Sequence, residues 1–254
     1  MDKNLTKRVA AVVGVLAVGL IVSFYWPASS GSSPEIVLPQ TGSADIDVDV
    51  GREEYNRRVA DEVVIDEHSV QRVVASLRRP DEYTFTGQTT LYYGDQSSTV
   101  SVRGAVRGAV RGELTKVVQS MTDNLYKHTI LTASEAYIWS SDTLSYYSGA
   151  RGDFTVDELA IIPTYEDLLA LPEEEITGGG FETVGETACI YAECQRSDGI
   201  MVDRYYISVE SGLLVRFQSY ENNVLVCETS MIPLIEAVDD DWFMLPSGSV
   251  VTGS

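Results

Sequence analysis

Three cysteines are the residues of this sequence that most readily suggest chemistry, because thiols form disulfides, bind metals and act as nucleophiles. Cys189 and Cys194 lie five residues apart, and Cys227 stands alone. On a shared strand the first two would point to opposite faces, so we expect no disulfide between them. A CxxxxC spacing without a second ligand pair does not indicate zinc. We therefore predict no metal site and no disulfide framework, while one bridge and one free thiol remain open.

The two histidines form no catalytic pattern. His68 precedes a predicted helix, His128 lies in a predicted strand, and neither has a Ser or Cys neighbour arranged as an activated nucleophile. The sequence contains no GxSxG, HExxH, P-loop or GxGxxG motif. The acidic runs at 173–175 and 239–241 are typical of solvated surfaces rather than of a glycosidase pair. We predict that the protein is not an enzyme and has no catalytic residues and no cofactor; an exported hydrolase is the least favoured alternative.

The charge of the chain excludes one class of partner. The 254 residues include 18 Lys and Arg and 38 Asp and Glu, for a net charge of −20. An excess of acid this large opposes binding to the phosphates of nucleic acid and to an anionic lipid surface. We predict no nucleic-acid partner; the acidic surface favours solubility and suits a basic protein partner.

A hydrophobic run near the N-terminus predicts where the rest of the chain lies. Residues 9–26 (VAAVVGVLAVGLIVSFYW) carry no charge and approach the ~20 residues that cross a bilayer. Lys7 and Arg8 precede the run, and no basic residue follows until Arg52, so the positive-inside rule places residues 1–8 in the cytoplasm. We predict a single-pass anchor in the cell membrane and an extracytoplasmic domain. The alternative, a signal peptide cleaved near residues 28–30, leaves the domain on the same side.

A tether and one domain follow the predicted anchor. Residues 27–51 are rich in Ser, Gly, Pro and Asp, which is typical of a flexible acidic linker with a reach of roughly 25–30 Å. Residues 52–254 suit a single domain that is large enough to bury a core. A tethered domain of this kind favours a binder that stays near the membrane over a free shuttle.

Hydrophobic periodicity within residues 52–254 predicts a few helices among many strands. Apolar residues recur with helical spacing after Ser69, and this helix must end before Pro80. A second helical segment, Thr155–Ile176, is broken by Pro163. The predicted strands are Tyr83–Tyr93, Thr99–Val110, Leu114–Met121, Lys127–Ala133, Ala136–Trp139, Leu144–Tyr147, Phe181–Gln195, Met201–Val209, Leu213–Tyr220 and Val224–Met231.

One strand carries a short tandem repeat. Residues 103–106 and 107–110 both read Arg-Gly-Ala-Val, too short a unit for a repeat protein. Because side chains alternate along a strand, a period of four places Arg103 and Arg107 on one face and Val106 and Val110 on the other. The small residues between them indicate strong bending or a close backbone approach.

These elements predict an α+β fold: a strongly curved antiparallel sheet, or half-barrel, with a few helices packed against or across its concave face and one transmembrane helix before it. In the strands around 205–217, alternate apolar residues form a band on one face of the sheet. A ligand cavity on this face would be lined by Tyr205, Ile207, Val215 and Phe217 from the sheet and by Leu168 and Leu169 from the helical segment. Ordinary core packing is the alternative role for each of these residues.

The order of four segments resembles the half-barrel family of LolA, LolB and RseB. The segments are SVQRVVASLRRP (69–80), IPTYEDLLAL (162–171), VESGLLV (209–215) and FMLPSG (243–248). The envelope layout is also similar to that of GerS-like proteins of Gram-positive spore formers, although this chain lacks their lipobox cysteine. The resemblance implies a non-enzymatic domain that holds a lipid, a lipoprotein or another hydrophobic ligand, such as an acyl chain, on the concave face. The alternative that it implies is a regulatory or scaffold ectodomain that binds another envelope protein, and a homodimer is left open.

Overall fold

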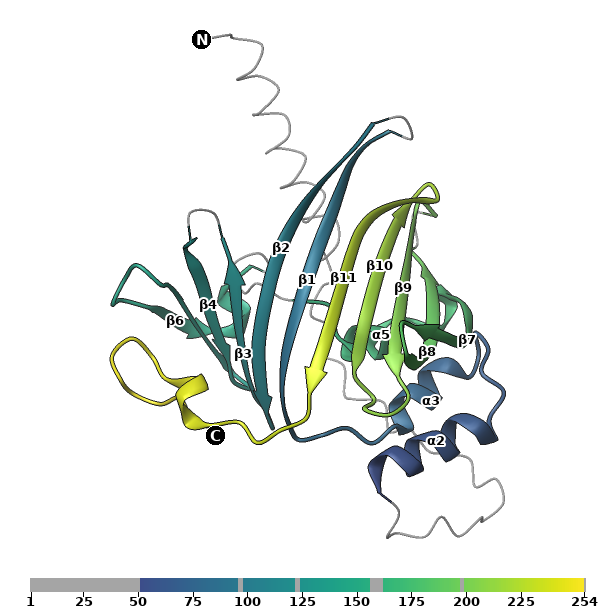
Figure 1. The fold of residues 1–254 in the computed structure, drawn as a ribbon, viewed down its shortest axis with the longest axis horizontal. Coiled ribbons are helices and arrows are strands. Elements are labelled where there is room, and N and C mark those ends of the chain that lie inside the picture. The colour runs from purple at the N-terminus through teal and green to yellow at the C-terminus, as the bar shows by residue number, and fades with distance from the viewer. Residues whose placement is uncertain (1–50, 96–97, 122–123, 156–161, 197–198, 254) are drawn as a thin grey trace.

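The computed structural model describes residues 51–253 except 96–97, 122–123, 156–161 and 197–198. Eleven antiparallel strands form one curled sheet in the order β6-β5-β4-β3-β2-β1-β11-β10-β9-β8-β7, and the sheet does not close on itself (Figure 1). A few helices accompany the sheet. The predicted combination of a large, curled antiparallel sheet with few helices is therefore confirmed.

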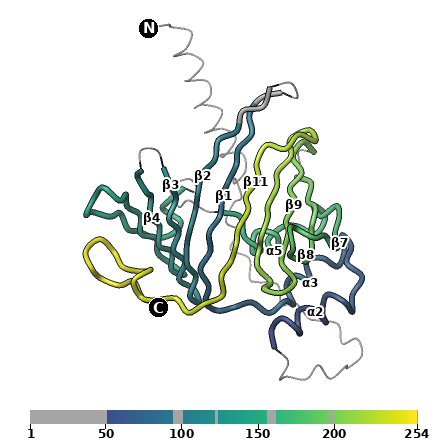
Figure 2. The backbone as a smooth tube through the Cα atoms, in the orientation of Figure 1, coloured from purple at the N-terminus to yellow at the C-terminus, as the bar shows by residue number. Residues whose placement is uncertain are grey.

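The first half of the sheet is a meander, and the last five strands form a second one. The hairpin of β1 and β2 is the longest of the sheet and stands out beyond its neighbours (Figure 2). The strands are β1 (Glu82–Asp95), β2 (Ser98–Arg111), β3 (Leu114–Ser120), β4 (Tyr126–Leu131), β5 (Glu135–Ser140), β6 (Tyr147–Ala150), β7 (Ile176–Val184), β8 (Thr187–Gln195), β9 (Met201–Ser208), β10 (Leu214–Glu221) and β11 (Val224–Leu234). The helices are α2 (Arg52–Glu62), α3 (Val70–Ser76) and α5 (Tyr165–Ala170), with 3-10 turns η2 (Arg151–Asp153), η3 (Glu173–Glu175) and η4 (Asp240–Phe243).

One face of the sheet, here called the helix face, is covered by α3 and α5. Val70, Val73 and Val74 of α3 are buried there, as the helical spacing in the sequence predicts. Leu168 of α5 is fully buried in the same cluster. A capping box, in which Thr164 and Asp167 satisfy each other's backbone N–H groups, starts α5 directly after Pro163. The short helix thus begins where the sequence permits and buries a single apolar stripe.

The opposite face, here called the tail face, is covered over β2–β5 by the C-terminal segment 238–251. Phe243 at the end of η4 is fully buried, and Val238, Leu245 and Val251 join it in one cluster with side chains of β2–β5. Figure 1 shows this segment as the yellow loop beside β3 and β4. The sheet therefore has apolar cover on both faces, from different parts of the chain.

The tandem repeat on β2 lies as the sequence predicts. Arg103 pairs with Thr90 and Arg107 pairs with Thr86, which places both arginines on the tail face. The glycines of the two copies differ in their surroundings. A Cβ on Gly108 would lie 2.2 Å from the carbonyl oxygen of Lys116 and 2.4 Å from the Phe85 ring, whereas a Cβ on Gly104 would meet nothing within 4 Å. The predicted close approach is confirmed for Gly108.

Two strand boundaries and one register differ from the prediction. The segment predicted as one strand, Phe181–Gln195, is a hairpin of β7 and β8 that turns at Gly185, whose φ of +62° suits glycine. The predicted strand Leu144–Tyr147 is shifted, because β6 begins only at Tyr147.

A β-bulge between Leu214 and Arg216 changes the phase of β10. Leu214 therefore lies opposite Ile207, where alternation predicts Val215, while Phe217 lies opposite Tyr205 as predicted. The predicted apolar band on this face exists, with Leu214 in the place of Val215.

The predicted anchor (9–26), the residues before it and most of the predicted linker lie outside the described residues. Within residues 51–253, apart from the gaps given above, no helix has the length and apolar character that crossing a membrane requires.

Candidate functional site

The six residues predicted to line a cavity differ in whether they belong to the helix-face core. Tyr205, Ile207, Phe217 and Leu168 meet in the helix-face core, where the rings of Tyr205 and Phe217 pack edge to face at 5.0 Å. Leu169 packs against the same cluster and is partly buried, whereas Val215 at the bulge is outside it. The structure thus brings five of the six together on the helix face.

An open pocket of about 520 Å3 lies on the other face of the sheet, between the strands β2–β5 and the C-terminal segment. None of the six residues lines it. The pairing register explains its composition: Arg107 of β2, Val118 of β3, His128 of β4 and Trp139 of β5 form one row of directly opposed residues on the tail face. Lys116 lies in the next row on the same face. The full lining is Arg107, Lys116, Val118, His128, Trp139, Ser141, Thr143, Asp241, Trp242, Met244, Leu245 and Pro246.

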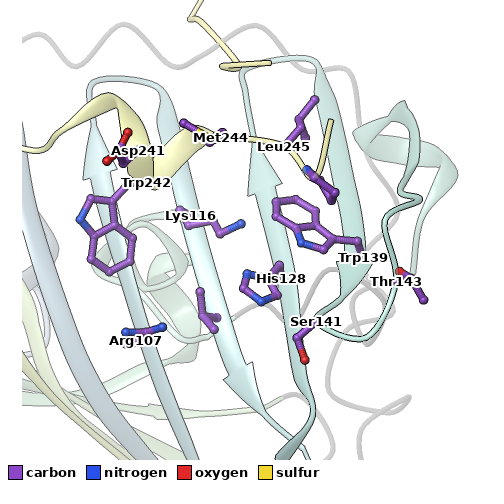
Figure 3. Close-up of a pocket in the computed structure, with 12 residues that line it drawn as sticks. Arg107, Lys116, His128, Trp139, Ser141, Thr143, Asp241, Trp242, Met244 and Leu245 are labelled. Carbon is purple, nitrogen blue, oxygen red and sulfur yellow. The ribbon is translucent and has the colours of Figure 1, made fainter. Parts of the chain in front are cut away.

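Aromatic rings frame the basic groups of the pocket. The Lys116 ammonium nitrogen lies 3.5 Å from the centroid of the Trp139 ring, a distance at which a cation is attracted to the ring face. The imidazole of His128 stacks on the same indole with a centroid separation of 5.0 Å. Figure 3 shows Lys116 and His128 between Trp139 on one side and Trp242 on the other. The pocket therefore combines apolar surface with basic side chains.

The pKa values of the basic groups are set by their burial and by the positive charges of their neighbours. Burial, together with the nearby Arg107 charge, lowers the pKa of Lys116 to about 7. Burial and the charges of Lys116 and Arg107 lower the pKa of His128 to about 4. At neutral pH His128 is therefore uncharged, and Lys116 is poised near its midpoint.

Polar contacts hold the C-terminal segment against the tail face. The Arg111 guanidinium pairs with Asp240 at 2.8 Å and donates a hydrogen bond to the Val238 carbonyl oxygen at 3.1 Å. The Val238 N–H donates to the Glu82 carboxylate at 2.9 Å. These contacts fix the chain just before η4, so that Phe243 is buried and Trp242 reaches the pocket.

The cysteines show no sign of an activated nucleophile. Cys189 and Cys194 are free and point to opposite faces of β8, as their spacing predicts. Burial raises the pKa of the Cys189 thiol to about 11 and that of Cys194 to about 12, and Cys227 rises to about 11. Thiols of this kind stay protonated at neutral pH. Among the described residues, no group of three or more His, Cys, Asp or Glu could hold a metal ion.

Sequence reasoning missed the tail-face pocket. Lys116, His128 and Trp139 lie on three strands about a dozen residues apart, and only the register brings them together. The signal that existed was a row of polar and aromatic residues in otherwise apolar strands, together with the repeated arginines. That signal has meaning only once the strand pairing is known.

The comparisons with known proteins concern the fold. No protein-family model matches the chain, and no curated protein matches it in sequence. The structure is similar to that of the lipoprotein LppX of Mycobacterium tuberculosis, with 11% identity, a TM-score of 0.41, and coverage of 68% of this chain and 95% of that one.

Two further solved structures are also similar to this one. The MucA/MucB complex of Pseudomonas aeruginosa matches with 11% identity and a TM-score of 0.40, over 79% of this chain and 63% of that one. A LolA superfamily protein of Nitrosomonas europaea matches with 8% identity and a TM-score of 0.30, over 76% of this chain and 97% of that one. With identities of 8–11%, these likenesses concern the fold alone.

Proposed function

We propose that the chain is a non-enzymatic binding domain, tethered to the outer face of the cell membrane by residues 9–26, which holds a hydrophobic ligand such as an acyl chain. The observation that carries the proposal is the tail-face pocket. Its volume of about 520 Å3 is in the usual range for a small-molecule site. Trp139, Trp242, Met244 and Leu245 give it apolar walls.

The ligand site proposed here lies on the tail face, whereas the sequence favours the helix face. On the helix face, Ile207 and Leu168 are fully buried by their neighbours, so a ligand there would have to displace packed side chains. On the tail face the pocket is already open. A preformed site avoids the free energy of reorganisation, which favours the tail face.

Titration of the full chain with a fluorescent fatty acid tests both the ligand and its location. We expect Trp242→Ala, a half-buried pocket residue, to weaken binding at least tenfold, and Leu169→Ala, on the helix face, to leave it unchanged. The opposite pattern would place the ligand on the helix face. Absence of binding to the wild-type chain would contradict the proposal as a whole.

A second candidate function is a scaffold that binds another envelope protein. Exposed apolar side chains favour it: Ile232 is 73% exposed and Leu234 57% exposed, and both lie on the tail face of β11, followed by Ile235. Apolar residues that stay exposed next to one another mark interaction surfaces. An acidic chain offers such a partner favourable electrostatics if the partner is basic.

Photo-crosslinking from position 232 in cells tests the scaffold function. We expect a specific adduct that the double variant Ile232→Ser and Leu234→Ser loses. A crosslinked product of twice the chain's mass would identify the partner as a second copy and support a homodimer. If position 232 gives no adduct above that of an exposed polar control such as Asn222, the scaffold proposal fails.

A further inference from the structure

The tail-face pocket gathers basic side chains in a strongly acidic protein. Arg107, Lys116 and His128 line it, and Asp241 is the only acidic residue of the lining. The chain as a whole carries a net charge of −20. In a chain with this excess of acidic residues, the ionisable side chains of a surface site chosen at random would be mainly acidic, whereas those that line this pocket are mainly basic.

Lys116 is the most unusual group of the pocket. The residue is only 3% exposed, and its ammonium nitrogen has no hydrogen-bond partner in the described part of the chain. The Trp139 ring below it attracts the charge but accepts no ordinary hydrogen bond from its N–H groups. A buried cation without acceptors is destabilising unless an anion completes its environment.

Arg107 is positioned to act on the same anion as Lys116. It lies opposite Val118, and Lys116 lies two residues away on the same strand and face, so the two side chains are diagonal neighbours about 7–8 Å apart at their Cα atoms. None of the ion pairs found among the described residues involves Arg107. Arg107 is an exposed residue that lines the pocket, so its guanidinium can donate hydrogen bonds to a ligand there.

We propose that this pocket binds the anionic head group of an amphiphile, a carboxylate or a phosphate, between Arg107 and Lys116. The apolar part of the ligand lies against Trp139 and Trp242. This inference rests on the proposed function and deepens it, because it names the class of ligand. In the complex the ligand supplies the acceptors that the Lys116 ammonium lacks within the described part of the chain.

Binding of such an anion depends on pH in a definite direction. The charged groups facing the site are Arg107 of β2, Lys116 of β3 and Asp241 of η4, with the neutral His128 of β4. The anion favours the protonated form of Lys116, so its affinity falls as the pH rises above neutral and Lys116 loses its proton. An uncharged ligand lacks this dependence.

Competition against a bound fluorescent fatty acid, with ligands of one chain length, tests the inference. The probes are dodecanoate, dodecyl phosphate, dodecanol and inorganic phosphate, each with the full chain. We expect dodecanoate and dodecyl phosphate to compete at concentrations at least tenfold lower than dodecanol at pH 6.5, and this preference to shrink at pH 9. Inorganic phosphate alone is expected to compete weakly; competition as strong as that of dodecyl phosphate would replace the amphiphile by a free anion and overturn the inference.

Three substitutions locate the preference. Arg107→Gln and Lys116→Met are expected to reduce the preference for the charged head group at least fivefold. Arg103→Gln is the matched control, because Arg103 begins the other copy of the Arg-Gly-Ala-Val repeat, lies on the same strand and face four residues before Arg107, and does not line the pocket. If dodecanol competes as well as dodecanoate, or if Arg107→Gln leaves the preference intact, the head-group inference fails while the proposed function stands. If no ligand with a dodecyl chain binds, both fail.

Discussion

The two faces of the sheet differ in whether a buried charged group has hydrogen-bond partners within the chain. On the helix face the buried carboxylate of Asp203 accepts hydrogen bonds from Arg196 Nη2 at 2.8 Å, from Arg196 Nε at 2.9 Å and from Ser219 Oγ at 2.6 Å. On the tail face the ammonium of Lys116 is as deeply buried and has only the Trp139 ring. A charge with all its partners in the chain serves the fold, whereas a charge without them indicates an external partner. The proposed function places the ligand on the face that carries the unpartnered charge.

The largest expected effect is the loss of the complete network. Asp203→Asn keeps the shape of the side chain but removes its charge, so Arg196 loses its ionic partner. We expect the free energy of unfolding to fall by about 2–3 kcal/mol, somewhat less than for a fully buried pair because Arg196 is partly exposed. Urea denaturation of the full chain measures it. An unchanged midpoint would show that the network is not structural.

Packing on the helix face gives the next effect. Gly108→Ala places a methyl group against the Lys116 carbonyl and the Phe85 ring, and we expect a loss of about 2 kcal/mol from the resulting strain. Gly104→Ala, in the other copy of the repeat, has open space and is expected to change stability by no more than about 0.5–1 kcal/mol, if anything upwards. Thermal unfolding of the two variants compares them directly. Equal destabilisation would mean that the surroundings of the two glycines do not differ as the structure has them.

Replacing Lys116, the unpartnered charge, is expected to raise the free energy of unfolding rather than lower it. Lys116→Met fills the same space without a charge, and we expect it to stabilise the ligand-free chain by about 1–2 kcal/mol below pH 7, after the loss of the contact with Trp139. Because burial lowers the pKa of Lys116 from 10.5 to about 7, the unfolded chain holds the extra proton between these values. The stability of the wild type therefore rises with pH across this window, and the gain from the substitution should vanish toward pH 10. Denaturation at pH 6.5 and pH 9.5 checks the sign; destabilisation at both would indicate that the fold requires this lysine.

Much of the helix face could be predicted from the sequence, because its signals are local. Val70, Val73 and Val74 show helical spacing, and Gly and Asn residues mark the hairpin turns. Phe217 lies opposite Tyr205 as alternation predicts. Leu214 takes the position opposite Ile207 where alternation predicts Val215, because the bulge between Leu214 and Arg216 adds a residue and has no clear signature in a single sequence.

The tail-face site could not be predicted for a different reason. Its basic groups come from β2, β3 and β4, and its cover comes from the C-terminal segment. Lys116 in an apolar strand reads as an outward-facing residue until Phe243 and Trp242 are known to lie over that face. Because this burial depends on tertiary contacts with a distant segment, neither the low pKa of Lys116 nor the pocket can be predicted from residue spacing along the chain.

Tryptophan emission offers the most direct test of the claim that the tail face is the binding face. The sequence has three tryptophans, and Trp26→Phe leaves Trp139 and Trp242, both of which line the pocket. A fatty acid brominated along its chain quenches tryptophan emission on contact. We predict that it removes most of this emission saturably, that the unbrominated acid reverses the effect, and that Arg107→Gln weakens it. If equilibrium dialysis shows stoichiometric binding of the brominated acid and this emission is not lost, the ligand does not lie on the tail face.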